Sequence, residues 1–187
     1  MNKIITLLSM TVFAAGHAMA ACNTNMAEST PTSRFFNNGD GTVIDSKTGL
    51  MWRRCPIDYG LDNNGTPDDM TDDACTPNGG APLTYSWGGA LNEASNLVYP
   101  VGSHNDWRLA SIKELSTIIE RQCDSPATNA VVFPNTPSAR FWSSSPDADS
   151  GGVAWYVDFA DSGRVNNDDT LGLKSVTYHA YVVRGGP

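Results

Sequence analysis

The stretch RFFNNGDGTVIDSKTGLMWRRC, residues 34–55, decides the fold because it places two turn signals between runs of strand-forming residues. NNGDG is a turn signal, and the TVI that follows it favours an extended strand. DSKTG reads as a second turn, after which LMWRRC resumes a strand. We therefore predict a β-hairpin with Gly39, Gly41 and Gly49 as its hinges.

Two helices are predicted in the middle of the chain. From Thr84 the apolar residues switch to helical i, i+3, i+4 spacing over 84–98, with Thr84 or Ser86 as the cap. The second helix is predicted to begin at Ser111, because SIKE is a capping box, and to end near Cys123.

Three further strands are predicted after a proline-rich loop at 124–138, which cannot be regular. They cover residues 140–144, 153–159 and 178–184, and a polar loop separates the last two. Strands at both ends with helices between them predict an α+β domain whose termini meet in one sheet.

The first twenty residues have the features of a secretory signal peptide. Lys3 precedes an apolar run, and Ala18 and Ala20 occupy the positions that a signal peptidase requires. An alternative is a lipoprotein signal with Cys22 acylated. We predict an exported protein, periplasmic, cell-surface or extracellular, with no transmembrane segment. Its parts would be a signal at 1–20, an extended leader at 21–33 and a single domain at 34–187.

The net charge and the cysteine content limit the classes of partner and ligand that we expect for this chain. The 187-residue chain has a formal net charge of −8, so its long-range field disfavours nucleic acids and polyanionic sugars. In an exported chain, four cysteines indicate disulfides before metal ligands. Three connectivities are open; we favour Cys55–Cys75, which would close an acidic insertion at 56–75, and Cys22–Cys123, which would tie the leader to the body.

The insertion LDNNGTPDDMTDDAC, residues 61–75, is the most suggestive stretch for metal binding. Asp62, Asn64, Asp68 and Asp72 offer hard oxygen ligands around a glycine turn, which suits calcium. The alternative is a solvated acidic loop held by the disulfide. No cofactor is required by this interpretation, and calcium is the one that we expect if any is bound.

Other residues invite a functional interpretation and a structural one. FWSSSP, residues 141–146, lacks a nucleophile elbow, so its serines are predicted to satisfy backbone groups at a strand rather than to pair with His104 or His179. Arg53, Arg54 and Arg184 could form a sugar- or carboxylate-binding patch, or pair with acids such as Asp45 and Asp158. The five tryptophans lie within predicted strands and helices and are expected mostly in the core.

Five motifs in order give a family resemblance: NGDGTVIDSKTGLMW, DWRLASIKEL, FPNTPSARFWSSSP, AWYVDF and YVVRGG. Over roughly residues 34–186 the chain resembles the Lcl C-terminal domain family of bacterial exported proteins. The resemblance implies a C-type-lectin-like fold, with two helices packed on small antiparallel sheets and the terminal strands paired. The resemblance to the best-known member implies a trimeric module that binds sulfated polysaccharides. This chain differs in two respects: it has no collagen repeat, and its net negative charge is the wrong sign for binding polyanions.

Three functional hypotheses follow. The first is a non-enzymatic recognition or adhesion domain that binds a glycan or protein on a surface through the loops 146–152 and 161–174, as a homo-oligomer in one version. The second is a structural subunit of a surface assembly without a small ligand. The third is an oxidase-like enzyme on the same scaffold, which would need a reactive cysteine pair.

Overall fold

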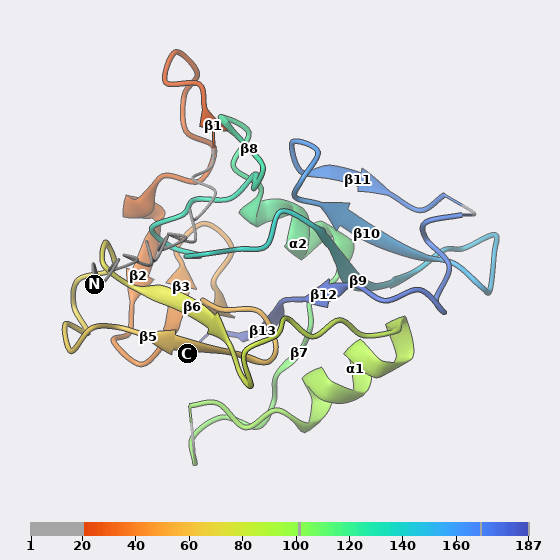
Figure 1. The fold of residues 1–187 in the computed structure, drawn as a ribbon, viewed down its shortest axis with the longest axis horizontal. Coiled ribbons are helices and arrows are strands. Elements are labelled where there is room, and N and C mark those ends of the chain that lie inside the picture. The colour runs from red at the N-terminus through yellow and green to blue at the C-terminus, as the bar shows by residue number, and fades with distance from the viewer. Residues whose placement is uncertain (1–20, 101, 169, 187) are drawn as a thin grey trace, which may run out of the picture.

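A computed structural model describes residues 21–100, 102–168 and 170–186, and in this part of the chain two α-helices combine with small sheets in an α+β arrangement (Figure 1). The predicted signal peptide, residues 1–20, lies outside the described residues. Two larger sheets organise the fold, and they meet where the chain crosses between them near its C-terminal end.

The predicted hairpin is confirmed and supplies two strands, β3 and β4, of a five-stranded antiparallel sheet. Its strands follow the order β2-β3-β4-β13-β7, so the C-terminal strand β13 lies between the hairpin and β7. The prediction that the two ends of the domain meet in one sheet is confirmed, because β13 pairs with β4 of the N-terminal hairpin. The first and last strands of the sheet in chain order, β2 and β13, are not direct partners, because β3 and β4 lie between them. The strands are β2 (Phe35–Asn37), β3 (Thr42–Asp45), β4 (Leu50–Arg53), β7 (Arg108–Leu109) and β13 (Val182–Gly185).

The second sheet has the order β11-β10-β9-β12, and its edge strand β12 is parallel to β9. The single strand predicted at 178–184 is therefore split between two sheets. Tyr181 lies at the crossing, fully buried, with its ring stacked 5.0 Å from that of Phe141. Residues 179–183 are all buried, so the sequence shows no change in apolar and polar alternation where the chain passes from one sheet to the other. The strands are β9 (Arg140–Pro146), β10 (Ala154–Asp158), β11 (Arg164–Asn166) and β12 (His179–Ala180).

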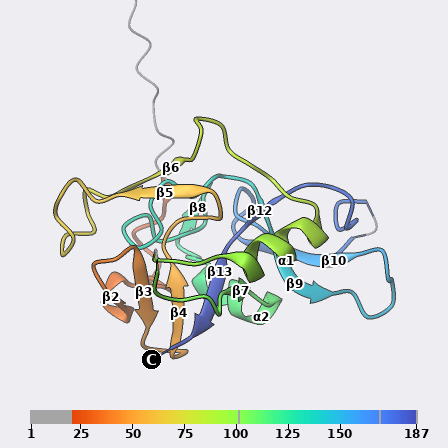
Figure 2. The same ribbon diagram turned by 90° about the horizontal axis from the view of Figure 1, so that it is seen from below.

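The helices begin where the sequence predicts, but the second ends early. Helix α1 (Trp87–Asn96) is capped by Ser86, and α2 (Ile112–Leu115) begins with the predicted capping box of Ser111 and Glu114. A 3₁₀ turn, η2 (Ser116–Ile118), completes the second helix. The expected continuation to Cys123 is wrong, because Ile119 has an extended backbone and a turn follows it, in which the Cys123 N–H donates to the carbonyl of Glu120. Figure 2 shows α1 beside β7 and β13, where Ala90 and Ala94 enter the core.

Two disulfides attach the peripheral segments. Cys22–Cys123 joins β1 to β8, and Cys55–Cys75 closes the insertion; these are the pairings favoured from the sequence. The insertion contains a hairpin that its composition did not predict. The remaining elements are β1 (Ala21–Cys22), η1 (Thr32–Arg34), β5 (Tyr59–Asp62), β6 (Ala74–Pro77) and β8 (Cys123–Asp124).

The core covers both faces of the second sheet. Neighbouring residues on β9, Phe141 and Trp142, belong to different buried clusters because successive side chains of a strand point to opposite faces. The proline-rich loop carries Phe133 into the first cluster, where its ring meets those of Phe35, Trp52 and Tyr181. An irregular segment therefore supplies the centre of the core.

Glu120 anchors the leader to the body of the domain. Its buried carboxylate accepts hydrogen bonds from the backbone and hydroxyl groups of Ser29 and Thr30, and from the backbone N–H of Gln122. Burial alone would raise the pKa of this carboxyl, but these donors outweigh it and lower the pKa to about 2. The lowered pKa means that the folded state favours the ionised form.

We expect Glu120→Gln to lower the free energy of unfolding by about 3 kcal/mol at pH 7, since one pKa unit corresponds to about 1.4 kcal/mol. The stabilisation is present above the ordinary glutamate pKa and is lost as the pH falls toward 2, where wild type and variant should converge. Urea unfolding at pH 7, 4 and 2 measures this difference. A constant difference between the proteins at all three values would contradict it; Glu93→Gln, at an exposed position on α1, is the control.

Candidate functional site

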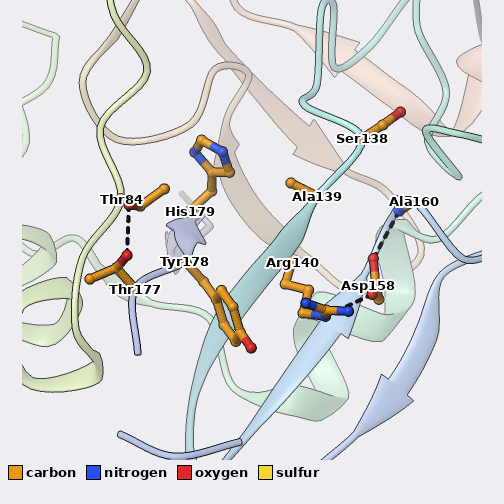
Figure 3. Close-up of a pocket in the computed structure, with 9 residues that line it drawn as sticks. All are labelled: Thr84, Ser138, Ala139, Arg140, Asp158, Ala160, Thr177, Tyr178 and His179. Atoms are coloured by element: carbon orange, nitrogen blue, oxygen red, sulfur yellow. Dashed lines mark hydrogen bonds and ion pairs between the residues drawn. The ribbon is translucent and has the colours of Figure 1, made fainter. Parts of the chain in front are cut away.

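A pocket of about 320 Å³ opens at one end of the second sheet (Figure 3). Its walls come from β9, β10 and β12 and from the chain before α1. This volume is at the small end for ligand pockets, about 300–1,000 Å³, and fits a single small ring better than an extended chain. The lining residues are Thr84, Ser138, Ala139, Arg140, Asp158, Ala160, Thr177, Tyr178 and His179.

Arg140 is the central charged group of the pocket. Its Nε lies 2.9 Å from Oδ2 of Asp158, and its side chain is 36% exposed. The guanidinium carbon lies 5.8 Å from the ring centre of Tyr178 and 5.9 Å from that of Tyr156, so two aromatic faces support it. Burial would lower the pKa of Arg140, but attraction to Asp158 and the tyrosines raises it. The cation is therefore held in one place with part of its surface open.

His179 forms part of the pocket wall. The residue is 7% exposed, and its ring packs 5.2 Å from that of Phe141 and 6.2 Å from that of Tyr59. Burial lowers the pKa of His179 below its usual value near 6.5, so the imidazole is neutral at pH 7. Figure 3 shows this ring and Ser138 on opposite sides of Ala139, with the Ser138 hydroxyl directed away from the imidazole.

Hydroxyl groups complete the rim. Thr84 and Thr177 hydrogen-bond to each other at 3.0 Å, and both are exposed. Asp158 also accepts the backbone N–H of Ala160 at 3.1 Å, which fixes its carboxylate beside the guanidinium. The pocket therefore presents fixed donors, fixed acceptors and rotatable hydroxyls within a small space, an arrangement suited to a polar ligand.

Two of the three serine hydroxyls of FWSSSP, those of Ser143 and Ser145, form hydrogen bonds with backbone groups. Ser143 is fully buried and donates to the carbonyl of Trp155 at 2.8 Å. Ser145 accepts the N–H of Ile112 at 3.0 Å, at the start of α2. The prediction that these hydroxyls satisfy backbone groups is confirmed for both residues.

The predicted calcium ligands are all exposed within the insertion. Asp62 accepts the N–H of Asn64, whose side-chain amide donates to the carbonyl of Asp72. The Asp72 carboxylate accepts the hydroxyl of Thr66 at 3.0 Å, while Asp68 lies at the exposed turn. Within 21–100, 102–168 and 170–186, no three His, Cys, Asp or Glu side chains are grouped as metal ligands would be. Calcium binding stays a prediction.

Of the two interpretations of Arg53, Arg54 and Arg184, the structure contradicts a shared binding patch and shows acidic partners for two of the three. Arg53 is buried, donates to the carbonyls of Cys55, Pro56 and Tyr59 and stacks on Tyr99. Arg54 is also buried and pairs with Asp73, whereas Arg184 pairs with Asp106 at the surface. The three side chains therefore share no binding surface. Of the acids suggested as their partners, Asp45 pairs with Arg34, and Asp158 with Arg140.

No tryptophan lies fully open on the surface of the described residues. Trp52, Trp107 and Trp142 are buried, as expected of core residues, whereas Trp87 and Trp155 are half-buried. Lys174 covers the Trp87 ring, with its Nζ 4.3 Å from the ring centre. This contact leaves Trp87 a poor platform for stacking a sugar.

The two loops predicted to bind a ligand are ordered by acidic side chains. Asp147 accepts the N–H groups of Asp149 and Ser150 and the side-chain amide of Asn167, which joins the loops to each other. Residues 147–152 and the described residues after β11, 167–168 and 170–174, lie beyond the end of β9 that is farther from Arg140, at the right of Figure 1, whereas β11 itself runs beside β10. Apart from the turn at 161–163, which follows Ala160, the two loops are separate from the pocket, and none of their residues lines it.

The pocket residues were missed by sequence reasoning. Arg140 and Asp158 come from β9 and β10, and Tyr178 immediately precedes β12. The register of these distant strands brings the three residues together. Asp158 lies opposite Arg140 across the β9–β10 pair. The alternation of residues along each strand does not reveal this pairing unless the register of the two strands is already known. No local motif marks the site.

Comparison with known proteins gives one match. The sequence profile of the Lcl C-terminal domain family matches residues 41–184. No curated protein and no solved structure matches the chain. Among the described residues, no helix is both long and apolar enough to cross a membrane. The match covers the hairpin, both helices, the pocket and β13 up to Arg184, and the chain belongs to the Lcl C-terminal domain family.

Proposed function

We propose that this chain is a non-enzymatic exported recognition domain, and that the pocket around Arg140 binds a glycan. The observation that carries the proposal is the ion pair of Arg140 and Asp158, fixed against Tyr178 at the rim of a small pocket. Sugar hydroxyls both donate and accept hydrogen bonds, so they fit a site where a donor and an acceptor lie side by side.

The chemistry of the pocket supports binding rather than catalysis. A nucleophile needs a base within hydrogen-bond reach, and Figure 3 shows the Ser138 hydroxyl directed away from His179. All four cysteines are in disulfides, so the cysteine pair that an oxidase would use is committed to structure. The C-type-lectin-like relationship and export through residues 1–20 are parts of the same proposal and stay predictions.

A glycan array with wild type and Arg140→Met tests the site. Methionine keeps the apolar stem that packs on the tyrosines but removes the donors. We expect at least a tenfold loss of affinity for the glycans that wild type binds, because hydrogen bonds to a charged group contribute about 1.5–3 kcal/mol. Arg121→Met, at an exposed arginine that does not line the pocket, should bind as wild type does.

Other outcomes would support a different binding site or a different function. Unchanged binding by Arg140→Met, with losses from substitutions in 147–152, would place the ligand on the predicted loops. No binding to any glycan, with a molecular mass that rises with concentration, would favour a structural subunit of a surface assembly. Repeating the array with a calcium chelator tests whether the acidic insertion contributes to recognition.

A further inference from the structure

We propose that the pocket selects an uncharged sugar ring through two neighbouring hydroxyls, and that Asp158 is the residue that sets this selectivity. The proposal rests on the proposed function and adds the chemical class of the ligand. It assigns to Asp158 a role that differs from that of Arg140: the arginine supplies affinity, and the aspartate excludes anions.

The charges inside the pocket cancel. Arg140 carries the positive charge and Asp158, 2.9 Å away, the negative one. His179 is neutral at pH 7 because of its burial, and the remaining polar groups are hydroxyls. An anion that approached Arg140 would therefore meet a carboxylate already paired with it, in a chain whose formal net charge is −8.

Among the described residues, Arg140 is the only arginine or lysine that lines the pocket. Arg164 is the cross-strand partner of Asp158 in β11, but its guanidinium lies 3.5 Å from the carboxylate of Asp161, and both side chains are exposed. Lys174 is bound to the carbonyl of Gly151, beyond the far end of β9. A sulfate or carboxylate would thus find one cation, and that cation is shared.

The same pair suits adjacent hydroxyls. A guanidinium offers five N–H donors and no acceptor, whereas a carboxylate offers only acceptors. One hydroxyl of a sugar can accept from Arg140 while its neighbour donates to Asp158. The Asp158 carboxylate has acceptor capacity for this, since the Ala160 N–H and the Arg140 guanidinium leave lone pairs of its two oxygens open. Thr84 and Thr177 can rotate to meet further hydroxyls.

The test compares matched sugars on wild type, Asp158→Asn and Glu93→Gln by titration. The probes are galactose, galacturonic acid and galactose 6-sulfate, with the corresponding glucose and mannose derivatives. We expect wild type to prefer the neutral member of a series by at least tenfold, with little dependence on salt. Asp158→Asn frees the charge of Arg140, so this variant should bind the acidic member of a series at least tenfold more tightly than the neutral member. Its binding of acidic sugars should weaken as salt is added.

Glu93→Gln controls for net charge, because it also removes one negative charge, at an exposed position on α1 that does not line the pocket. It should keep the preference of wild type. If Asp158→Asn is secreted poorly, Asp158→Ser makes the same charge change with a smaller side chain.

The outcomes separate the two proposals. If wild type binds neutral sugars and Arg140→Met does not, but Asp158→Asn keeps the original preference, the selectivity is overturned and the recognition function stands. A wild type that prefers the acidic sugars also overturns the selectivity alone. Absence of binding to every probe, together with a silent glycan array, overturns both.

Discussion

Replacement of Asp45 by asparagine is expected to lower the free energy of unfolding by about 3–5 kcal/mol, because it leaves a buried guanidinium without its counter-ion. Asp45 is fully buried and accepts from both Nε and Nη2 of Arg34, which is itself 8% exposed. The third nitrogen of Arg34 donates to the carbonyl of Thr117, so the guanidinium cannot turn toward water without breaking that contact.

The pair also joins two parts of the fold. Asp45 ends β3 and accepts the N–H of Lys47 and the hydroxyl of Thr48, which shape the turn of the hairpin. Different oxygens of Asp45 accept these two hydrogen bonds, Oδ1 from Lys47 and Oδ2 from Thr48, and asparagine keeps only one of the two acceptors. The substitution therefore removes the charge together with one acceptor of the turn. Urea unfolding followed by tryptophan fluorescence measures the loss.

Asp161→Asn provides the matched comparison. Its pair with Arg164 is exposed on both sides, and such pairs contribute less than about 1 kcal/mol. Equal losses for the two variants would show that burial of the Arg34–Asp45 pair does not govern its effect on stability.

Truncation of Phe133 to alanine is the second large effect that we expect, with a loss of about 3–5 kcal/mol. Phe133 is fully buried, and its ring lies 5.6 Å from those of Phe35 and Tyr181 and 6.3 Å from that of Trp52, all edge-on. Alanine would remove these aromatic contacts and leave a cavity between the two sheets.

Two comparisons show whether packing causes the loss. Phe133→Leu keeps most of the volume and should cost less than about 1.5 kcal/mol. Phe36→Ala removes the same side chain from a position that is 67% exposed, and its effect should be close to zero. Thermal or urea unfolding of the three variants ranks their losses in the free energy of unfolding. A loss in Phe133→Ala no larger than that in Phe36→Ala would contradict a central role for the loop in the core.

Local chemistry made several elements predictable. The hairpin at 34–55 follows from turn residues placed between strand formers, and the two helix starts follow from serine caps, one of them a complete capping box. In each case the deciding interaction lies within a few residues, so sequence neighbours are sufficient to specify it.

Predictions failed where distant groups decide the conformation. The second helix ends at Ile118, and Glu120 then binds Ser29 and Thr30, 90 residues away or more. The insertion forms the hairpin β5–β6 beside its disulfide, although its composition resembles that of an irregular loop. Long-range hydrogen bonds and a covalent bridge supply what local propensity does not.

The sequence by itself determined the family, the order of the α+β elements and the residues most suited to the core, because turn signals, caps and apolar spacing act over short distances. Only the tertiary structure decided that 178–184 crosses between two sheets, that Arg53 and Arg54 are buried, and that Arg140, Asp158 and Tyr178 share a pocket. These three features depend on strand register and sheet packing, which place side chains from remote segments within contact distance, and no pattern along the chain encodes that distance directly.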